Sequence, residues 1–353
     1  MDIKSFDYYL PPGYIAQEPL TKRDNSKLMI IDKKTGFLQH KRFYQIDDFL
    51  HSGDLLVLNN SKVIPVRLYG NKKNTGGKIE TLLINKLADN HWKALLKPGK
   101  RIHIGTEIIF SPELNGEIVE KNDNEGSYII KMNARDDFNK ILHKIGIVPT
   151  PPYIKKKLDN SDLYQTVYAS TEGSIAAPTA GFHFTKELLN KIKSKGVEIL
   201  FLTLHIGRGT FEMINEEKIE DHIMKSELYT ITDRNAKILN QAIKANRRII
   251  GVGTSVTRAL ESSISIKDSI IREGTRWTDL YIYPGFKYRV IKVLLTNFHL
   301  PRSTPLMLAS AFAGKELLLN AYREAIKQNY RFYSFGDSML IFGNDKTKLH
   351  LEP

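Results

Sequence analysis

The 353-residue chain contains no cysteine. Disulfides, zinc-thiolate sites, a thiol nucleophile and a cysteine-ligated iron-sulfur cluster are therefore excluded by the sequence itself. Histidines and carboxylates remain as the side chains that could move protons near neutral pH. Any catalytic hypothesis for this chain has to be built from them.

Long apolar runs are also absent. The longest ones are far shorter than the roughly 20 residues that a membrane-spanning helix needs, and the amino-terminal residues Met1–Asp7 contain no signal-peptide core. We therefore expect a cytoplasmic protein.

Acidic residues are fewer than basic ones. The 39 Asp and Glu face 52 Lys and Arg, which gives a formal net charge of +13, and basic residues recur in groups such as Lys22-Arg23, Lys155-Lys-Lys157 and Arg247-Arg248. A polyanionic partner, most simply nucleic acid, fits this balance. Solubility alone would explain the same charge equally well.

The pattern of short segments predicts two domains. Residues 63–146 contain several short β-type runs separated by turn residues, which is typical of a small β-barrel. Strand and helix patterns alternate in residues 1–62 and 147–353, which indicates an α/β fold. We therefore expect an α/β main domain, discontinuous in sequence, with the small β-barrel domain inserted at 63–146.

Three histidines follow expected strands or loops of the α/β domain. His183 lies in a loop of small residues, Thr185 is placed to cap the next helix, and His205 follows the apolar strand 197–204. His299 follows a strand expected at 292–296, and 281–285 is a further strand candidate. Each histidine alone reads as a hydrogen-bonded structural residue. Three at the carboxyl ends of strands indicate a common pocket, in which an imidazole can act as a general base.

A glycine turn follows the strand expected at 248–253. Gly253, Thr254 and Ser255 stand where a helix should begin, so their amides and hydroxyls suit a ribose, carboxylate or phosphate. The third glycine of a dinucleotide-binding fingerprint is replaced by Val256, and the Walker lysine is missing. Tight packing between strand and helix is the alternative explanation.

Two acidic positions complete the set of candidates. Glu227 stands close in sequence to His222. The two could form a catalytic pair, or the segment could be a solvated acidic turn with a structural histidine. Asp337 follows an aromatic segment that could stack on a base or pack in the core.

These segments, in this order, resemble the S-adenosylmethionine-dependent tRNA ribosyltransferase-isomerases of queuosine biosynthesis. The resemblance covers nearly the whole chain. It is carried by the blocks Gly53-Asp-Leu-Leu-Val-Leu-Asn-Asn60, Val63-Ile-Pro-Val-Arg-Leu-Tyr-Gly70, Pro151-Pro-Tyr-Ile154, Ala176-Ala-Pro-Thr-Ala-Gly-Phe-His-Phe184, Leu204-His-Ile-Gly-Arg-Gly-Thr-Phe211, Thr296-Asn-Phe-His-Leu-Pro301 and Arg331-Phe-Tyr-Ser-Phe-Gly-Asp337.

The chain departs from the family pattern at three places. Lys225 stands where the family usually has a second histidine, and Arg208 stands where the family has a small residue. At Gly253–Arg258 the family sequence is close to G-T-T-S-V-R, whereas this chain has Gly-Thr-Ser-Val-Thr-Arg. Lys225 weakens any mechanism that needs two histidines in that segment. Thr254 and Arg258 stay in register.

The resemblance implies a reaction. The ribosyl portion of S-adenosylmethionine is transferred and isomerised onto 7-aminomethyl-7-deazaguanine at the tRNA wobble position, giving epoxyqueuosine and releasing adenine and methionine. S-adenosylmethionine is then a substrate, and neither a cofactor nor a metal is needed, because its sulfonium acidifies the adjacent C5′ hydrogens. The expected partners are S-adenosylmethionine and the tRNA anticodon stem-loop, without a membrane.

Site roles follow as a hypothesis. His183, His205 and His299 would surround the ribose, one of them as the base, with Glu227 or Asp337 orienting or protonating a partner. S-adenosylmethionine would be bound by Gly253, Thr254 and Arg258, with Arg258 on its carboxylate. Two other classes compete with this enzyme: a methyltransferase, which would release S-adenosylhomocysteine, and a non-catalytic RNA-binding module, which would bind tRNA independently of S-adenosylmethionine.

Overall fold

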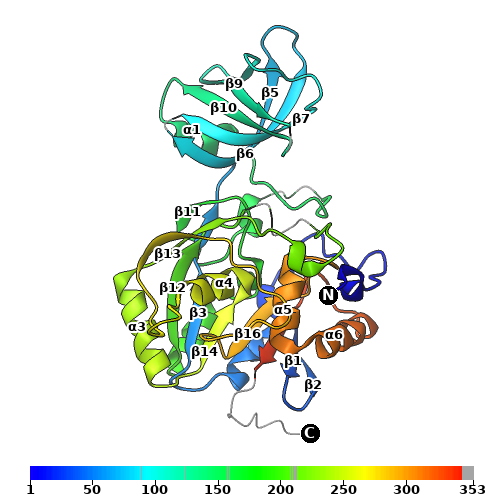
Figure 1. The fold of residues 1–353 in the computed structure, drawn as a ribbon, viewed down its shortest axis with the longest axis vertical. Coiled ribbons are helices and arrows are strands. Elements are labelled where there is room, and N and C mark those ends of the chain that lie inside the picture. The colour runs from blue at the N-terminus through cyan, green and yellow to red at the C-terminus, as the bar shows by residue number, and fades with distance from the viewer. Residues whose placement is uncertain are drawn as a thin grey trace. The chain divides into compact units, whose positions relative to one another are not determined.

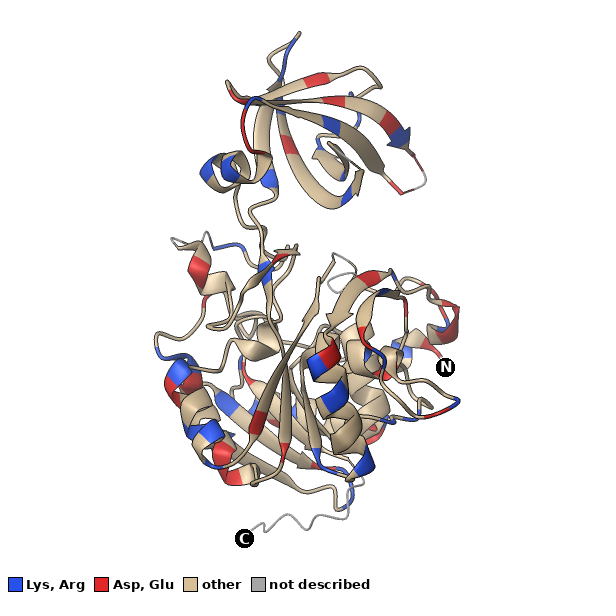
Figure 2. Cartoon of the chain, turned by 90° about the vertical axis from the view of Figure 1, so that its left-hand side faces the viewer, with Lys and Arg blue, Asp and Glu red and all other residues tan. Residues whose placement is uncertain are grey.

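The computed structural model describes residues 1–88, 90–123, 125–156, 158, 160–207, 209 and 213–343. The chain forms two compact units, Met1–Lys62 with Pro151–Pro353, and Val63–Thr150 (Figure 1). Lys and Arg residues occur on both units (Figure 2). Arg208, one of the departures from the family pattern, lies outside the described residues.

The first unit is built on a nine-stranded mixed sheet with the order β15-β13-β12-β3-β14-β16-β17-β1-β2. Its strands are β1 (Lys27–Asp32), β2 (Leu38–Arg42), β3 (Leu55–Asn59), β12 (Glu198–Leu204), β13 (Glu227–Ile231), β14 (Ile249–Val252), β15 (Gly274–Thr278), β16 (Val293–Asn297) and β17 (Ser338–Phe342). A separate two-stranded sheet joins β4 (Ser61–Val63) to β11 (Thr171–Ser174).

Helical segments cover both faces of the large sheet, because its central strands are apolar on both sides. Met29 and Ile31 of β1 belong to one core together with α3 (Asp233–Lys244), α4 (Gly253–Ser263), α5 (Thr304–Ala313) and α6 (Lys315–Lys327). Leu28 and Ile30 face the other core, with α2 (Lys186–Ser194) and the 3₁₀ segment Phe43–Phe49. Alternate side chains thus enter opposite cores, as the pleat of a strand requires.

Most of the expected elements are confirmed. Thr185 caps α2 by accepting a hydrogen bond from the Leu188 amide, and the glycine turn leads into α4 as expected. The strand expected at 281–285 is wrong: that segment makes no ladder and packs irregularly, with Ile282 buried. The edge strands β2 and β15 were missed, because edge strands are mostly exposed and lack the apolar pattern of the central ones.

The second unit is a closed antiparallel barrel with the order β10-β7-β6-β5-β8-β9. Its elements are β5 (Arg67–Lys72), β6 (Lys78–Ala88), β7 (His91–Lys97), β8 (Glu107–Ser111), β9 (Leu114–Asn122), β10 (Ser127–Ala134) and the helix α1 (Phe138–Ile145). Alternating burial along β7 places Trp92, Ala94 and Leu96 inside. The inserted β-barrel of the sequence analysis is therefore confirmed as an element of the fold.

The topology of the large sheet fixes where a site can form. β12 and β14 flank β3, β14 pairs with β16, and all three pairings are parallel, so the carboxyl ends of these four strands share one edge. Open α/β sheets bind ligands at such an edge. No helix among the described residues is both long and apolar enough to cross a membrane.

Candidate active site

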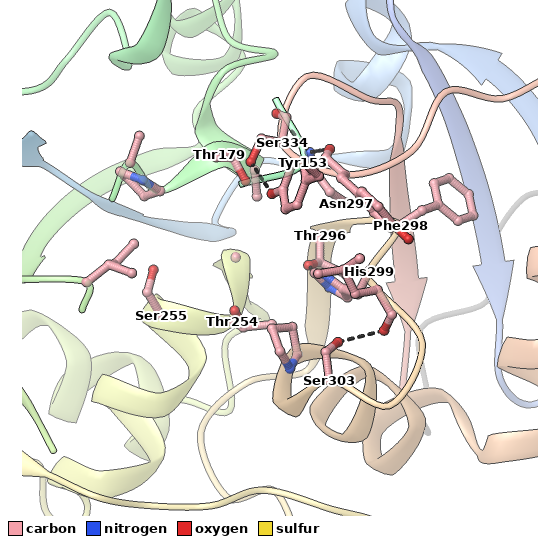
Figure 3. A pocket seen from close by; sticks show the side chains of 18 residues that line it. Tyr153, Thr179, Thr254, Ser255, Thr296, Asn297, Phe298, His299, Ser303 and Ser334 are labelled. Atoms are coloured by element: carbon pink, nitrogen blue, oxygen red, sulfur yellow. Dashed lines mark hydrogen bonds between the residues drawn. The ribbon is translucent and has the colours of Figure 1, made fainter. Parts of the chain in front are cut away.

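A cavity opens at the carboxyl edge of the sheet, around the start of α4 (Figure 3). We call it the first cavity; it encloses about 600 Å³ of empty space, including its mouth. Its walls come from the loop around Ala177–Ala180, from α4, from the segment after β16 and from Tyr333–Ser334. The lining residues are Tyr153, Ala177, Pro178, Thr179, Ala180, Ile206, Gly253, Thr254, Ser255, Thr296, Asn297, Phe298, His299, Leu300, Ser303, Pro305, Tyr333 and Ser334.

A second cavity adjoins the first one. The two share four lining residues, Ile206, Thr254, Ser255 and Pro305. The rest of the second cavity is mostly apolar, apart from one ion pair; these residues are Met224, Glu227, Arg258, Leu280, Tyr281, Ile282, Thr304 and Leu308. One bipartite molecule could therefore occupy both cavities across the start of α4.

The start of α4 gives both cavities a set of backbone donors. Gly253 has φ +86°, a left-handed conformation that favours glycine, and the helix begins directly at this residue. No side chain caps the helix. The backbone amides of its first turn can therefore donate hydrogen bonds to a ligand. Such a terminus attracts anions and partial negative charge.

His299 is the one histidine of the three candidates that lines the first cavity. Its Nε2 is hydrogen-bonded to the hydroxyl of Thr296 at 2.8 Å, and its backbone amide donates to Tyr322 at 2.8 Å. Burial lowers the pKa of His299 to about 3. The imidazole is therefore neutral at physiological pH and able to accept a proton.

His183 lies beneath the cavity rather than in it. It is 3% exposed and stacks on Phe43. Its Nδ1 is 2.7 Å from the Ser26 hydroxyl and its Nε2 is 3.3 Å from Oδ1 of Asn297. Burial lowers the pKa of His183 to about 4, which keeps the ring neutral.

The partners of Asn297 fix the tautomer of His183. Nδ2 of Asn297 donates to the carbonyls of Tyr333 and Ser334, so its Oδ1 must accept the proton of His183 Nε2. Nδ1 then accepts from Ser26. His183 is not among the residues that line the first cavity, and it contacts the cavity residue Asn297.

Glu227 and Arg258 form a buried ion pair in the wall of the second cavity. Glu227 also accepts a hydrogen bond from the Gly207 amide at 2.8 Å. The guanidinium of Arg258 donates to the carbonyls of Leu280 and Thr278 besides Glu227. Arg258 is therefore engaged by the protein on all three nitrogens, which leaves it poorly placed to be the direct ligand of a substrate carboxylate.

His205 and Asp337 are not among the residues that line either cavity. The ring of His205 lies against Gly173, and burial lowers its pKa. Asp337 accepts hydrogen bonds from the backbone amides of Lys27 at 2.8 Å and Arg331 at 2.7 Å, and burial raises its pKa. Asp337 thus joins the starts of two neighbouring strands, β1 and β17.

Several lining residues were missed as site candidates. Asn297 and Thr296 stand in the block Thr296-Asn-Phe-His-Leu-Pro301, where only the histidine was selected. Tyr153 is hydrogen-bonded to the Ser334 hydroxyl at 2.7 Å in the wall of the first cavity, although the two are far apart in sequence. Their signal was membership in distinctive blocks, because nothing in their residue types alone marks a site.

His222 is hydrogen-bonded to Glu216 at 3.1 Å and packs edge-on against Tyr281. Within the described part of the chain no three His, Asp or Glu side chains are grouped so that they could hold a metal ion.

Comparisons with known proteins agree on one family. The family model described as "Queuosine biosynthesis protein" matches residues 3–341. An S-adenosylmethionine:tRNA ribosyltransferase-isomerase of Thermoanaerobacter sp. (strain X514) is 50% identical over 342 residues, which are 97% of this chain and 100% of that protein. The crystal structure of an S-adenosylmethionine tRNA ribosyltransferase from Thermotoga maritima matches with a TM-score of 0.55 and 38% identity, covering 96% of this chain and 100% of that one. The chain belongs to the queuosine biosynthesis protein family, the family of the S-adenosylmethionine:tRNA ribosyltransferase-isomerases.

Proposed function

We propose that this S-adenosylmethionine:tRNA ribosyltransferase-isomerase holds S-adenosylmethionine across the two adjoining cavities and transfers its ribosyl group to the wobble base of tRNA. The acceptor is 7-aminomethyl-7-deazaguanine, and the products are epoxyqueuosine in tRNA, adenine and methionine. The observation that carries the proposal is the pair of cavities that share the start of α4, one lined by His299 and the other by the Glu227–Arg258 pair. We assign catalysis to the α/β unit, since both cavities belong to it.

The second cavity suits the adenine ring. Met224, Leu280 and Ile282 offer apolar surface for a flat aromatic group. The Glu227 carboxylate lies in the wall of this cavity, where it can accept a hydrogen bond from the adenine amino group. Arg258 acts through Glu227 by keeping this carboxylate in place, which replaces its expected contact with the methionine carboxylate.

The start of α4 suits the carboxylate of the methionine part. The first turn of α4 carries a partial positive charge on its backbone amides, and its residues Thr254 and Ser255 line both cavities. This site needs no arginine.

His299 is the base that we assign to the first step. Its neutral ring can accept a C5′ proton, which the neighbouring sulfonium acidifies. A low pKa makes it a weak base, so it works only on a carbon that is already activated. The Thr296 hydroxyl on Nε2 orients the ring. His183 supports the site by holding Asn297, and Asp337 holds the strands below it.

Product analysis tests the proposal. The protein is incubated with S-adenosylmethionine and a tRNA carrying 7-aminomethyl-7-deazaguanine, and the small molecules are separated. Adenine and methionine in equal amounts, dependent on the modified tRNA, are expected. S-adenosylhomocysteine would indicate a methyltransferase, and tRNA binding without any product would indicate an RNA-binding module.

The base assignment is tested with His299→Gln, His183→Gln and His205→Gln in the same assay. His299→Gln should lower the rate of adenine release most, and full activity of this variant would reject His299 as the base.

A further inference from the structure

The α/β unit has a second concave region, lined largely by basic side chains. We call it the basic groove: it encloses about 550 Å³ of open space, and its lining residues are Lys27, His40, Lys41, Arg42, Gln45, Gln328 and Tyr330. No Asp or Glu is among these residues. The groove shares no residue with either cavity at the start of α4.

Strand register places the groove on the same edge of the sheet as the first cavity. In the ladders from β16 to β2, Asn297 pairs with Ser338, Ser338 with Leu28, and the neighbouring Lys27 with Arg42. These residues stand at matching ends of four adjacent strands. Three strand spacings of about 4.8 Å put the groove roughly 14 Å along this edge from the cavity residue Asn297.

The groove and the first cavity are also joined by hydrogen bonds. Ser26, next to Lys27, bonds His183, which in turn bonds Asn297 in the cavity wall. Asp337 accepts the Lys27 amide. The position of the groove relative to the cavity is therefore fixed by buried contacts within one unit.

The three cationic side chains of the groove are not held in ion pairs with any described residue. No ion pair of Lys27, Lys41 or Arg42 with an Asp or Glu occurs in the described part of the chain; Lys27 and Arg42 donate to backbone carbonyls instead. Two acids border the groove: Glu324 lies 3.8 Å from His40, and Asp337 accepts a hydrogen bond from the Lys27 amide at 2.8 Å. At the opposite edge of the sheet, by contrast, Arg247 pairs with Glu198 and Arg248 with Asp54.

We propose that the basic groove binds the phosphate backbone of the tRNA anticodon arm while the wobble base enters the first cavity. This inference rests on the proposed function. A distance of roughly 14 Å spans only a few nucleotides of one nucleic-acid strand, so the contact falls within the anticodon arm. Lys41 and Arg42 contribute ammonium and guanidinium donors to phosphate, and such contacts position the RNA without reading its sequence.

Charge reversal tests the groove. The groove variant combines Lys41→Glu and Arg42→Glu. The control pair combines Lys193→Glu and Lys244→Glu, which gives the same change of net charge. These two lysines are exposed near the ends of α2 and α3, before the amino ends of β12 and β14. Binding of a tRNA that carries 7-aminomethyl-7-deazaguanine is measured by fluorescence anisotropy at several salt concentrations. The groove variant should bind at least about 10-fold more weakly, and the slope of log K against log salt should shrink by about 1.4 to 1.8, the value for two lost phosphate contacts. The control pair should change the slope by less than half as much.

Steady-state kinetics separate binding of RNA from damage to the active site. The groove variant should raise the KM for tRNA and leave the KM for S-adenosylmethionine unchanged, with an unaltered melting temperature. A synthetic anticodon stem-loop should show the same loss as the full tRNA. Equal loss in the control pair, an unchanged salt slope, or a loss seen only with full-length tRNA would overturn the inference. Absence of adenine release by the unmodified protein would instead reject the proposed function.

Discussion

Two buried arginine–carboxylate pairs lie at opposite ends of the same sheet. Arg258 and Glu227 have 7% and 4% of their side chains exposed, and Arg248 and Asp54 have 6% each. The first pair lies at the carboxyl ends of the parallel strands and lines the second cavity. The second pair lies at their amino ends, since Arg248 directly precedes β14 and Asp54 directly precedes β3.

The surroundings of the two pairs differ more than their burial does. Arg248 is bonded to both oxygens of Asp54, to the Phe49 carbonyl and to Nδ1 of His51, and it lines neither of the two cavities described above. Glu227 accepts from the Gly207 amide through Oε1 and from the Arg258 guanidinium through Oε2, and it lines the second cavity. Burial of a charged pair is therefore no sign of function by itself. The adjoining cavity is what distinguishes the pair at the start of α4.

The largest expected effect is one that the two pairs should share. Arg248→Met and Arg258→Met each leave a carboxylate buried without its partner, so each should lower the free energy of unfolding by about 3–5 kcal/mol. Urea unfolding followed by circular dichroism measures this. A loss below about 1 kcal/mol in either variant would mean that water reaches the remaining carboxylate.

Replacing each carboxylate by its amide should affect enzyme activity differently in the two ion pairs. Glu227→Gln should lower kcat/KM for adenine release by roughly 100-fold or more, about 2.7 kcal/mol, because the adenine amino group loses its charged acceptor. Asp54→Asn should leave the activity of the folded enzyme within about twofold of the original. Comparable losses in both variants would show that the distinction between the two ends of the sheet is wrong.

Histidines at the two ends provide a second matched pair. His299→Gln should reduce kcat about 100-fold, the usual magnitude for a general base, with little change in the KM for S-adenosylmethionine. His51→Gln, at the Arg248 pair, should leave kcat unchanged. Single-turnover measurement of adenine release isolates the chemical step, and an unimpaired His299→Gln enzyme would remove this residue from the mechanism.

The smallest effect concerns pH and the positioning histidine. The pKa of His183 is lowered from 6.5 to about 4 in the fold, so the unfolded chain binds the extra proton first as pH falls. The contribution of His183 to the free energy of unfolding is fully present above pH 6.5 and is lost progressively as pH falls from 6.5 to 4. Between pH 6.5 and 5 the free energy of unfolding falls by about 1.5 kcal/mol. His183→Asn should remove that part of the pH dependence. Chemical unfolding at pH 6.5 and 5 tests it, and identical pH dependence in both proteins would contradict it.

Much of the fold could be predicted from local pattern. Thr185 caps α2, Gly253 turns β14 into α4, and the apolar central strands read directly as buried ones, because capping, left-handed glycines and burial on both faces leave local traces in sequence. The irregular segment around Tyr281 was mistaken for a strand. Its alternating aromatic and aliphatic residues pack on the core, but no strand among the described residues lies beside them to form a ladder. Whether a neighbouring strand is present cannot be read from the local sequence pattern.

The sequence by itself determined the absence of thiol chemistry, the α/β body with its inserted barrel, and the family of the chain. Only the tertiary structure decided which polar residues meet in a cavity. His183 and His299 look alike in sequence, yet one is packed beneath Asn297 and the other lines the cavity. The physical reason is that a strand fixes the position of the residue after it, whereas the direction of that side chain depends on partners, such as Ser26 and Thr296, brought in by the packing of other segments.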